Sequence, residues 1–360
     1  MTGSLYRFVR SRARSLLSHD NGVPRVIAAS DKFRGTASAP EVADAIAFAA
    51  EDAGWTVDRA PMSDGGEGLL DVFGGANRST AVTGPLGRIV DAAWRLDGTT
   101  AIIESAQACG IVLAGGAEHN DPVGATTAGV GELLTAALDA GARHLIVGLG
   151  GSASTDGGLG ALRSGPRPGR MKAVELLIAC DVDTPFTDAA TVFGPQKGAS
   201  PKQVELLERR LITLLSGYRD DYAIDLTDVA GAGAAGGLGG GLVVLGGRIV
   251  RGVDAVADEV ELDDRIEAAD LVVTGEGFLD GASFAGKVVG GIVERAEWAK
   301  TPVVVVVGDA DDEGLAAAAA CSSPPHVINL TALHGEDAAQ AFTTQLVRTE
   351  VSRYLESLGL

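Results

Sequence analysis

The sequence predicts an α/β protein in which a Rossmann-like parallel-sheet domain contains a second, inserted α/β domain. Short apolar runs of strand length alternate with helical stretches near both ends of the chain. Between them lies a stretch of short alternating strands that breaks this rhythm. The 360 residues allow one large domain or two ordinary ones. We expect an extension at 1–24, the Rossmann-like domain at 25–65 and 266–360, and the inserted domain at 66–265.

The composition excludes some classes of protein and ligand. A net charge of −19 argues against a nucleic-acid binder, which would show a basic face. Three cysteines without a CxxC pair are typical of reduced thiols in a cytoplasmic protein. No apolar run reaches the roughly 18 residues of a membrane span. The arginine-rich residues 1–24 are interpreted as a poorly ordered extension, with a targeting peptide or a surface helix as alternatives.

The chain opens with a βαβ unit. Residues 26–29 predict a strand, 39–53 a helix capped by Thr36 or Ser38, and Trp55 begins a second strand that ends near Asp64. Because the crossover is helical, we expect the two strands to be parallel.

The middle of the chain is less regular. We expect short strands within 69–103, a helix at 129–140, strands at 144–149 and 174–179, a loop at 163–170 and a helix at 200–218. The densest glycine block, 231–241, follows. After it the βα rhythm resumes, with strands at 271–273, 303–307 and 326–329 and helices at 287–299, 312–320 and 337–358. The first and last parts would then share one parallel sheet, and the cleft between the domains would collect the loops at Asp31, Asp64 and Glu276.

Three glycine motifs invite a nucleotide interpretation. Gly281–Lys287 fits GxxxxGK, but Val288 replaces the required Ser or Thr and the motif starts eight residues after the expected strand end, so a P-loop is disfavoured. Lys287 lies at the expected start of a helix and remains a candidate for binding phosphate. The alternative interpretation is a solvated surface lysine. Gly231–Gly236 fits GxGxxG, which is weak alone, and a turn for close backbone approach is favoured. The run 148–158 predicts either an anion-binding nest or a tight structural crossover.

Acidic residues recur where strands end. They are Asp31, Asp64, Asp156, Asp181 and Glu276. Each alone could be a helix cap, but five beside Gly, Ser or Thr suggest a site that needs carboxylates for a divalent metal and a base. The basic residues within the same motifs are Lys32, Arg34, Lys197 and Lys287. Metal, cations and glycine amides together indicate phosphoryl transfer.

Eight motifs in order resemble the bacterial glycerate kinase family that lacks a P-loop. They are DKFRGT (31–36), MSDGGEG (62–68), TGPLG (83–87), GLGGSASTDGG (148–158), ACDV (179–182), VFGPQKGA (192–199), GAGAAGGLG (231–239) and TGEGFLD with GK (274–287). The resemblance covers almost everything from Val26 to the C-terminal helix. It implies ATP- and Mg²⁺-dependent phosphorylation of D-glycerate, giving 2-phosphoglycerate in this branch, with two α/β domains around the active site. The alternative acceptor is the 3-hydroxyl group.

The chain also departs from the family pattern. The usual DSFKGS is DKFRGT here, so Lys32 stands where the family has a hydroxyl and Arg34 where it has lysine. The segment between Gly158 and the ACDV motif is several tens of residues shorter than is usual in the family. Substrate preference and the shape of the inserted domain depend on these differences.

The combined interpretation assigns roles to individual residues. Asp31 or Asp64 is the expected base, with Lys287 as a further catalytic residue. The residues expected to bind substrate or phosphate are Lys32, Arg34, Gly150, Gly151, Ser152, Lys197, Gly233 and Gly236. The expected metal ligands are Asp156, Asp181 and Glu276. The partners are D-glycerate and ATP, with a homodimer as a further expectation. The alternatives are a non-catalytic protein that binds a nucleotide or small acid and, on the GxGxxG match alone, a nicotinamide dehydrogenase.

Overall fold

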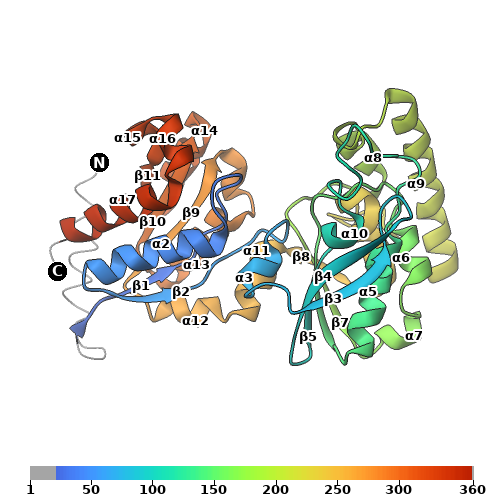
Figure 1. Ribbon diagram of the computed structural model, residues 1–360, viewed down its shortest axis with the longest axis horizontal. Coiled ribbons are helices and arrows are strands. Elements are labelled where there is room, and N and C mark those ends of the chain that lie inside the picture. Colours follow the sequence, from blue (N-terminus) through green and yellow to red (C-terminus); the bar gives the residue numbers. More distant parts are fainter. Residues whose placement is uncertain (1–21, 359–360) are drawn as a thin grey trace. The chain divides into compact units, whose positions relative to one another are not determined.

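The protein divides into two compact units, which are described separately (Figure 1). The structure is a computed structural model that describes residues 22–358, so the expectation for the extension falls almost wholly outside the described residues. Unit 1 runs to Asp64 and resumes at Val256, and unit 2 comprises Gly65–Ala255. The second boundary lies within α11 (Gly252–Glu259), earlier than the expected 265/266. The reason is that α12 (Leu262–Glu267) buries Leu262 and Ile266 and packs against a helix of unit 1.

Unit 1 is built on a five-stranded sheet in the order β11-β10-β9-β1-β2. Its strands are β1 (Arg25–Ala28), β2 (Thr56–Arg59), β9 (Leu271–Leu279), β10 (Val303–Ala310) and β11 (His326–Asn329). Every neighbouring pair is parallel. The expectation that the first βαβ unit and the last third of the chain share one parallel sheet is confirmed.

Helices cover this sheet because its strands are apolar on both faces. Val26 and Ala28 of β1 pack with Val42 and Ile46 of α2 and with Val351 of α17 in one buried cluster. The helices of unit 1 after β1 are α2 (Ala39–Asp52), α12, α13 (Val288–Ala299), α14 (Asp312–Ala320), α15 (Leu330–His334), α16 (Glu336–Ala341) and α17 (Thr343–Ser357). Figure 1 shows α2 and α17 side by side, as their contacts require.

The single C-terminal helix expected at 337–358 is wrong. Over this range the chain forms α16 and α17 instead, separated at Phe342, where φ is −128°, and α16 is in turn separated from α15 at Gly335, where φ is 84°. Neither backbone conformation continues an α-helix.

The expected break after residue 273 is also wrong, because β9 continues to Leu279. Glu276 pairs with Val307 and Phe278 with Asp309 in the parallel register with β10. The glycines that suggested a turn are instead places of close approach within the sheet. A Cβ atom on Gly275 would lie 2.0 Å from the carbonyl oxygen of Val306. Glu276 therefore lies on a strand rather than in a loop.

Unit 2 contains a six-stranded mixed sheet in the order β3-β4-β5-β6-β7-β8. The strands are β3 (Arg78–Thr83), β4 (Ile89–Asp97), β5 (Thr100–Glu104), β6 (His144–Gly148), β7 (Glu175–Cys180) and β8 (Arg248–Arg251). The pairs among β3, β4 and β5 are antiparallel, and those from β5 to β8 are parallel. The α/β class expected for the inserted region is confirmed.

The helices of unit 2 before α11 are α3 (Leu69–Val72), α4 (Ala106–Cys109), α5 (Ala128–Asp139), α6 (Leu159–Ser164), α7 (Pro168–Met171), α8 (Ala189–Phe193), α9 (Pro201–Tyr222) and α10 (Ala234–Val244). Of these, α5 and α9 correspond to the helices expected at 129–140 and 200–218, and the others were not expected. The expected loop at 163–170 holds the end of α6 and most of α7. The glycine block forms α10, which is kinked by left-handed residues at 235–237. Across 22–358, no helix has both the length and the apolar character needed to cross a membrane.

Candidate active site

The strongest candidate site lies in unit 1, at the carboxyl ends of β1 and β9. These two strands are neighbours, but the chain continues from β1 to β2 on one side and from β9 to β10 on the other. Ligands bind at such a switch point in open α/β sheets, because the loops diverge and leave a crevice. A cavity of about 600 Å³ is found there, lined by residues 31–36, Asp64 and the end of β9. This volume lies in the range of small-molecule sites.

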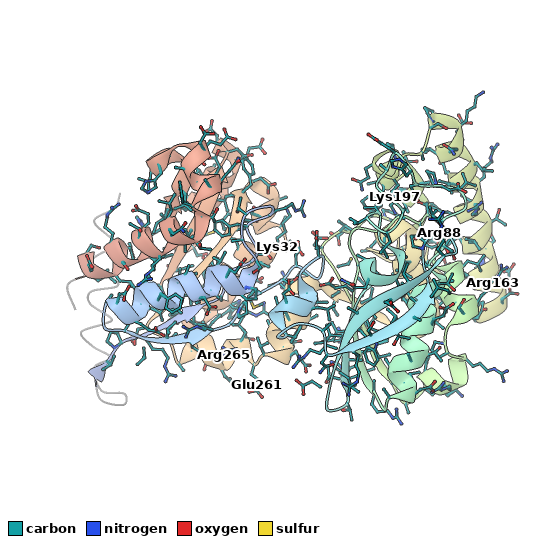
Figure 2. The ribbon with its side chains drawn as sticks, viewed as in Figure 1. Lys32, Arg88, Arg163, Lys197, Glu261 and Arg265 are labelled. Carbon is teal, nitrogen blue, oxygen red and sulfur yellow. The ribbon has the colours of Figure 1, made fainter. Side chains whose placement is uncertain are left out.

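Lys32 lies between the two carboxylates that were expected to act as base. Its Nζ is 3.7 Å from Oδ1 of Asp31 and 3.6 Å from Oδ1 of Asp64. The three side chains are only 10–17% exposed. Figure 2 shows Lys32 on the loop that follows β1. The expected phosphate contact of Lys32 therefore competes with two anionic partners within the protein.

Burial raises the pKa of Asp31 to about 6, although the Lys32 ammonium opposes this effect. The Asp31 carboxylate also accepts a hydrogen bond from the Lys32 backbone N–H, at 2.7 Å. Two contacts hold the loop in place. Phe33 forms a β-bridge with Ala37, and its backbone packs closely on β9, since a Cβ atom placed on Gly277 would lie 3.3 Å from the Phe33 Cα. Asp31 thus combines a fixed position with a pKa close to neutrality, as a general base requires.

Glu276 enters the same cavity from β9. Its Oε1 atom is buried and has no hydrogen-bond partner among residues 22–358, and burial raises the pKa of its carboxyl to about 7. A buried carboxylate oxygen without a partner is unusual, and such atoms occur at catalytic groups and beside bound waters or ions. Asp280 caps the following 3-10 helix η4 (Gly281–Phe284), and its Oδ1 lies 3.8 Å from Nζ of Lys287.

Lys287 is the N-cap residue of α13 and lines the cavity. Because β9 ends at Leu279, the GxxxxGK run begins two residues after the strand, so the expected spacing of eight residues is wrong. Val288 still supplies no hydroxyl, and the run forms η4. Lys287 therefore lies at the start of a helix beside the cavity, without a Walker loop.

Acidic residues outnumber basic ones around the cavity. Six acidic and three basic residues line it: Asp31, Asp64, Glu276, Asp280, Asp309 and Glu336 against Lys32, Arg34 and Lys287. An anionic ligand would be repelled by this excess unless further cations accompany it.

Some residues of the cavity wall were not identified from the sequence. Phe278, Asp309, Thr331, Glu336, Gln340 and Thr343 all line it. Asp309 follows the same pattern as the other strand-end acids, since it comes after Val303–Val307, and that pattern could have revealed it. Glu336 and Gln340 depend on α16, which was not separated from the final helix.

The other expected site residues belong to unit 2. Lys197 is 4% exposed, and its Nζ donates to Ser152 Oγ at 2.8 Å and to the Ser154 carbonyl at 2.6 Å. Burial lowers the pKa of Lys197 to about 8. Both Lys197 and Lys32 are labelled in Figure 2, each in its own unit. In this arrangement Lys197 holds the 150–156 loop from inside, and its assignment to a phosphate stays a prediction.

The two expected metal ligands of unit 2 have different environments. Asp156 is buried and accepts hydrogen bonds from Thr127 N and Oγ1 and from the amides of Gly158 and Gly160, at 2.9–3.1 Å. Its oxygens thus join the starts of α5 and α6. Asp181 is exposed directly after β7. Both residues belong to unit 2, whereas the cavity that Glu276 lines is formed by residues of unit 1, and the assignment of Asp156 and Asp181 to a metal stays a prediction.

The glycine candidates of unit 2 are positions of tight packing. A Cβ on Gly236 would lie 2.0 Å from the Ser154 carbonyl oxygen, and one on Gly233 would lie 2.3 Å from that of Pro185. A Cβ on Gly150 would lie 3.0 Å from Cα of Gly66, and Gly151 has a φ of 58°. These contacts explain the glycine motifs by packing, and any ligand contact of Gly150, Gly151, Gly233 and Gly236 stays a prediction.

The sequence matches the Glycerate kinase family over residues 26–165 and 166–351. The chain belongs to the glycerate kinase family. It is therefore a phosphotransferase that acts on glycerate. The two matched pieces adjoin between residues 165 and 166.

Individual members agree with this assignment. The chain is 37% identical to the Glycerate kinase of Bacillus subtilis, covering 79% of this chain and 85% of the relative. It is 36% identical to the Glycerate 2-kinase of Escherichia coli, covering 80% and 86%. The fold matches a crystal structure assigned as glycerate kinase 2 from Salmonella typhimurium LT2, with a TM-score of 0.79 and 30% identity, covering 94% of this chain and 100% of that chain.

Proposed function

We propose that this glycerate kinase transfers the γ-phosphoryl group of ATP to D-glycerate, with Mg²⁺, and forms 2-phosphoglycerate. The observation that carries the proposal is the cavity of unit 1, where Asp31, Asp64 and Glu276 meet Lys32 and Lys287 at the switch point of a parallel sheet. The Escherichia coli relative named Glycerate 2-kinase supports the choice of the 2-hydroxyl group.

The cavity fits a magnesium ion that arrives with a nucleotide. Within residues 22–358 no group of three or more His, Cys, Asp or Glu side chains could hold a metal by itself. Mg²⁺ in kinases commonly uses one or two carboxylates together with phosphate oxygens and waters. Glu276 suits this role because its Oε1 is buried and without a partner among the described residues. The bound ion would neutralise phosphate charge that the acidic cavity otherwise repels.

The chain's own residues supply the remaining functions. An ionised carboxylate, Asp31 or Asp64, accepts the proton of the glycerate hydroxyl as the phosphoryl group transfers. Asp31 suits this role because its pKa of about 6 leaves it mostly ionised at neutral pH while keeping it basic. Arg34 and Lys287, at the edge of the same cavity, would bind the carboxylate or phosphate groups of the substrates.

The test is consumption of ATP that depends on D-glycerate, followed by phosphorus NMR of the product. We expect turnover with D-glycerate, none without it, and a phosphate ester at the 2-position. A 3-phosphate product would refute the choice of hydroxyl group while leaving the kinase reaction intact. Binding of ATP or glycerate without turnover would instead support the non-catalytic alternative.

A further inference from the structure

The pair of acids in the cavity already has a cation. Asp31 and Asp64 both lie within 3.7 Å of the Lys32 ammonium, and the three side chains are at most 17% exposed. Lys32 comes directly after Asp31, whose carboxylate accepts the Lys32 N–H, so the backbone fixes one end of this arrangement. The Lys32 ammonium is therefore attracted by a carboxylate on each side, Asp31 and Asp64.

Two carboxylates facing one point are also the usual means of attracting a divalent cation. Mg²⁺ retains several of its waters and is often held by one or two carboxylates, partly through those waters. In this chain the position between Asp31 and Asp64 is filled by Nζ of Lys32. A positive charge there repels any second cation at short range.

We propose that Lys32 is a resident cation that keeps divalent metal away from Asp31 and Asp64. Glu276 is the contrasting case in the same cavity, because its Oε1 has no hydrogen-bond partner within the described chain. With Lys32 in this position, a divalent metal binds at Glu276 and not at the Asp31–Asp64 pair. This division makes Lys32 a positioning residue.

The consequence for the reaction rests on the proposed function. A divalent ion bound directly to a carboxylate stabilises its charged form more strongly than the single charge of Lys32 does, and so makes it a poorer proton acceptor. With Lys32 in place, the pair keeps a carboxylate that can take the proton of the substrate hydroxyl group. The metal-binding behaviour itself does not depend on which substrate the enzyme uses.

The experiment measures Mn²⁺ binding to the full-length protein without nucleotide or glycerate, by electron paramagnetic resonance of the free ion. Lys32→Met keeps an unbranched side chain of similar length and removes its charge. We expect this variant to bind one more Mn²⁺ than the wild type, or to bind it at least about tenfold more tightly, since a unit charge at this range is removed. The added site should disappear again in the double variant Lys32→Met/Asp64→Asn.

Two controls keep the result specific. Lys202→Met makes the same change of net charge at an exposed position at the start of α9, and should bind Mn²⁺ as the wild type does. Circular dichroism establishes that each variant is folded, and Lys32→Gln replaces Lys32→Met if the latter is not. Unchanged Mn²⁺ binding in the folded Lys32 variant would overturn the proposal. So would a wild-type Mn²⁺ site that is lost on Asp64→Asn. Neither outcome bears on whether D-glycerate is the substrate, which the ATP assay decides.

Discussion

Replacing Lys197 by methionine should change how the stability of unit 2 depends on pH. Lys197 is 4% exposed, and its ammonium donates to Ser152 Oγ and to the Ser154 carbonyl. Burial is the largest influence on this group, and it lowers the pKa from the usual 10.5 to about 8. Methionine keeps an unbranched side chain of similar length but removes the charge.

The size of the effect follows from the two pKa values. Between about pH 8 and 10.5 the unfolded chain binds a proton that the folded protein does not, so wild-type stability gains from this residue as pH rises. A pKa difference of roughly 2.5 corresponds to about 3 kcal/mol, most of which is gained by pH 10. Below about pH 8 both states are protonated and the contribution is constant. The variant lacks this gain entirely.

At neutral pH the two proteins should be closer in stability. The variant loses two hydrogen bonds from a charged donor, each worth about 1.5–3 kcal/mol. It also avoids the cost of burying the ammonium, about 3 kcal/mol by the same pKa difference. These two terms act in opposite directions, so the difference in stability between the two proteins should be smaller at neutral pH than in alkaline solution.

The assay compares urea unfolding of wild type and Lys197→Met at pH 7.5 and pH 10. A Trp55→Phe/Trp298→Phe background leaves Trp94 as the one tryptophan in the sequence, and it reports on unit 2. Buried Tyr218 and Cys109 have raised pKa values and make both proteins less stable as pH rises, so only the difference between the proteins is interpreted. Lys202→Met is the charge-matched control. Equal pH dependence of Lys197→Met and wild type would refute the reasoning.

Three further predictions concern unit 1. Asp64→Asn should lower kcat by about 10²–10⁴, the range for loss of an acid–base group, with an unchanged circular dichroism spectrum; near-normal turnover would remove Asp64 from the mechanism. kcat/KM should fall as pH drops through 7 to 6, because Glu276 and Asp31 have pKa values of about 7 and 6 and become protonated; Glu276→Gln should remove the step near pH 7, and a flat profile from pH 5 to 8 would contradict both assignments. Gly275→Ala should destabilise unit 1 by about 1–3 kcal/mol in urea unfolding, because its Cβ would lie 2.0 Å from the Val306 carbonyl oxygen; wild-type stability would show that β9 and β10 can separate without cost.

The strands of unit 1 could be predicted because burial on both faces leaves a local signal. Runs such as Val303–Val307 are apolar without alternation, which is typical of strands covered by helices on both sides. The extent of β9 could not be predicted in the same way. Gly275 and Gly277 are typical of a turn, and only their neighbours across the fold, the Val306 carbonyl and the Phe33 backbone, show that they serve close packing in and beside a strand.

The candidate site was predictable in part for a similar reason. Acids that follow parallel strands meet at one edge of a sheet, so Asp31, Asp64 and Glu276 could be grouped before their positions were known. The same rule also selected Asp156, whose carboxylate instead joins two helix starts inside unit 2 through donors from Thr127, Gly158 and Gly160. A strand-end acid in a cavity and one in a buried hydrogen-bond network look alike in the sequence.

The sequence by itself determined the α/β class, the shared parallel sheet of the first and last segments, and membership of the glycerate kinase family, because these depend on local apolar periodicity and on ordered motifs. The tertiary structure alone decided what each charged group contacts. It placed Lys32 between Asp31 and Asp64, bound the buried Lys197 to Ser152 and Ser154, and left Oε1 of Glu276 buried without a hydrogen-bond partner in the described chain. The physical reason is that charge and burial act through distances across the fold, which the order of residues does not specify.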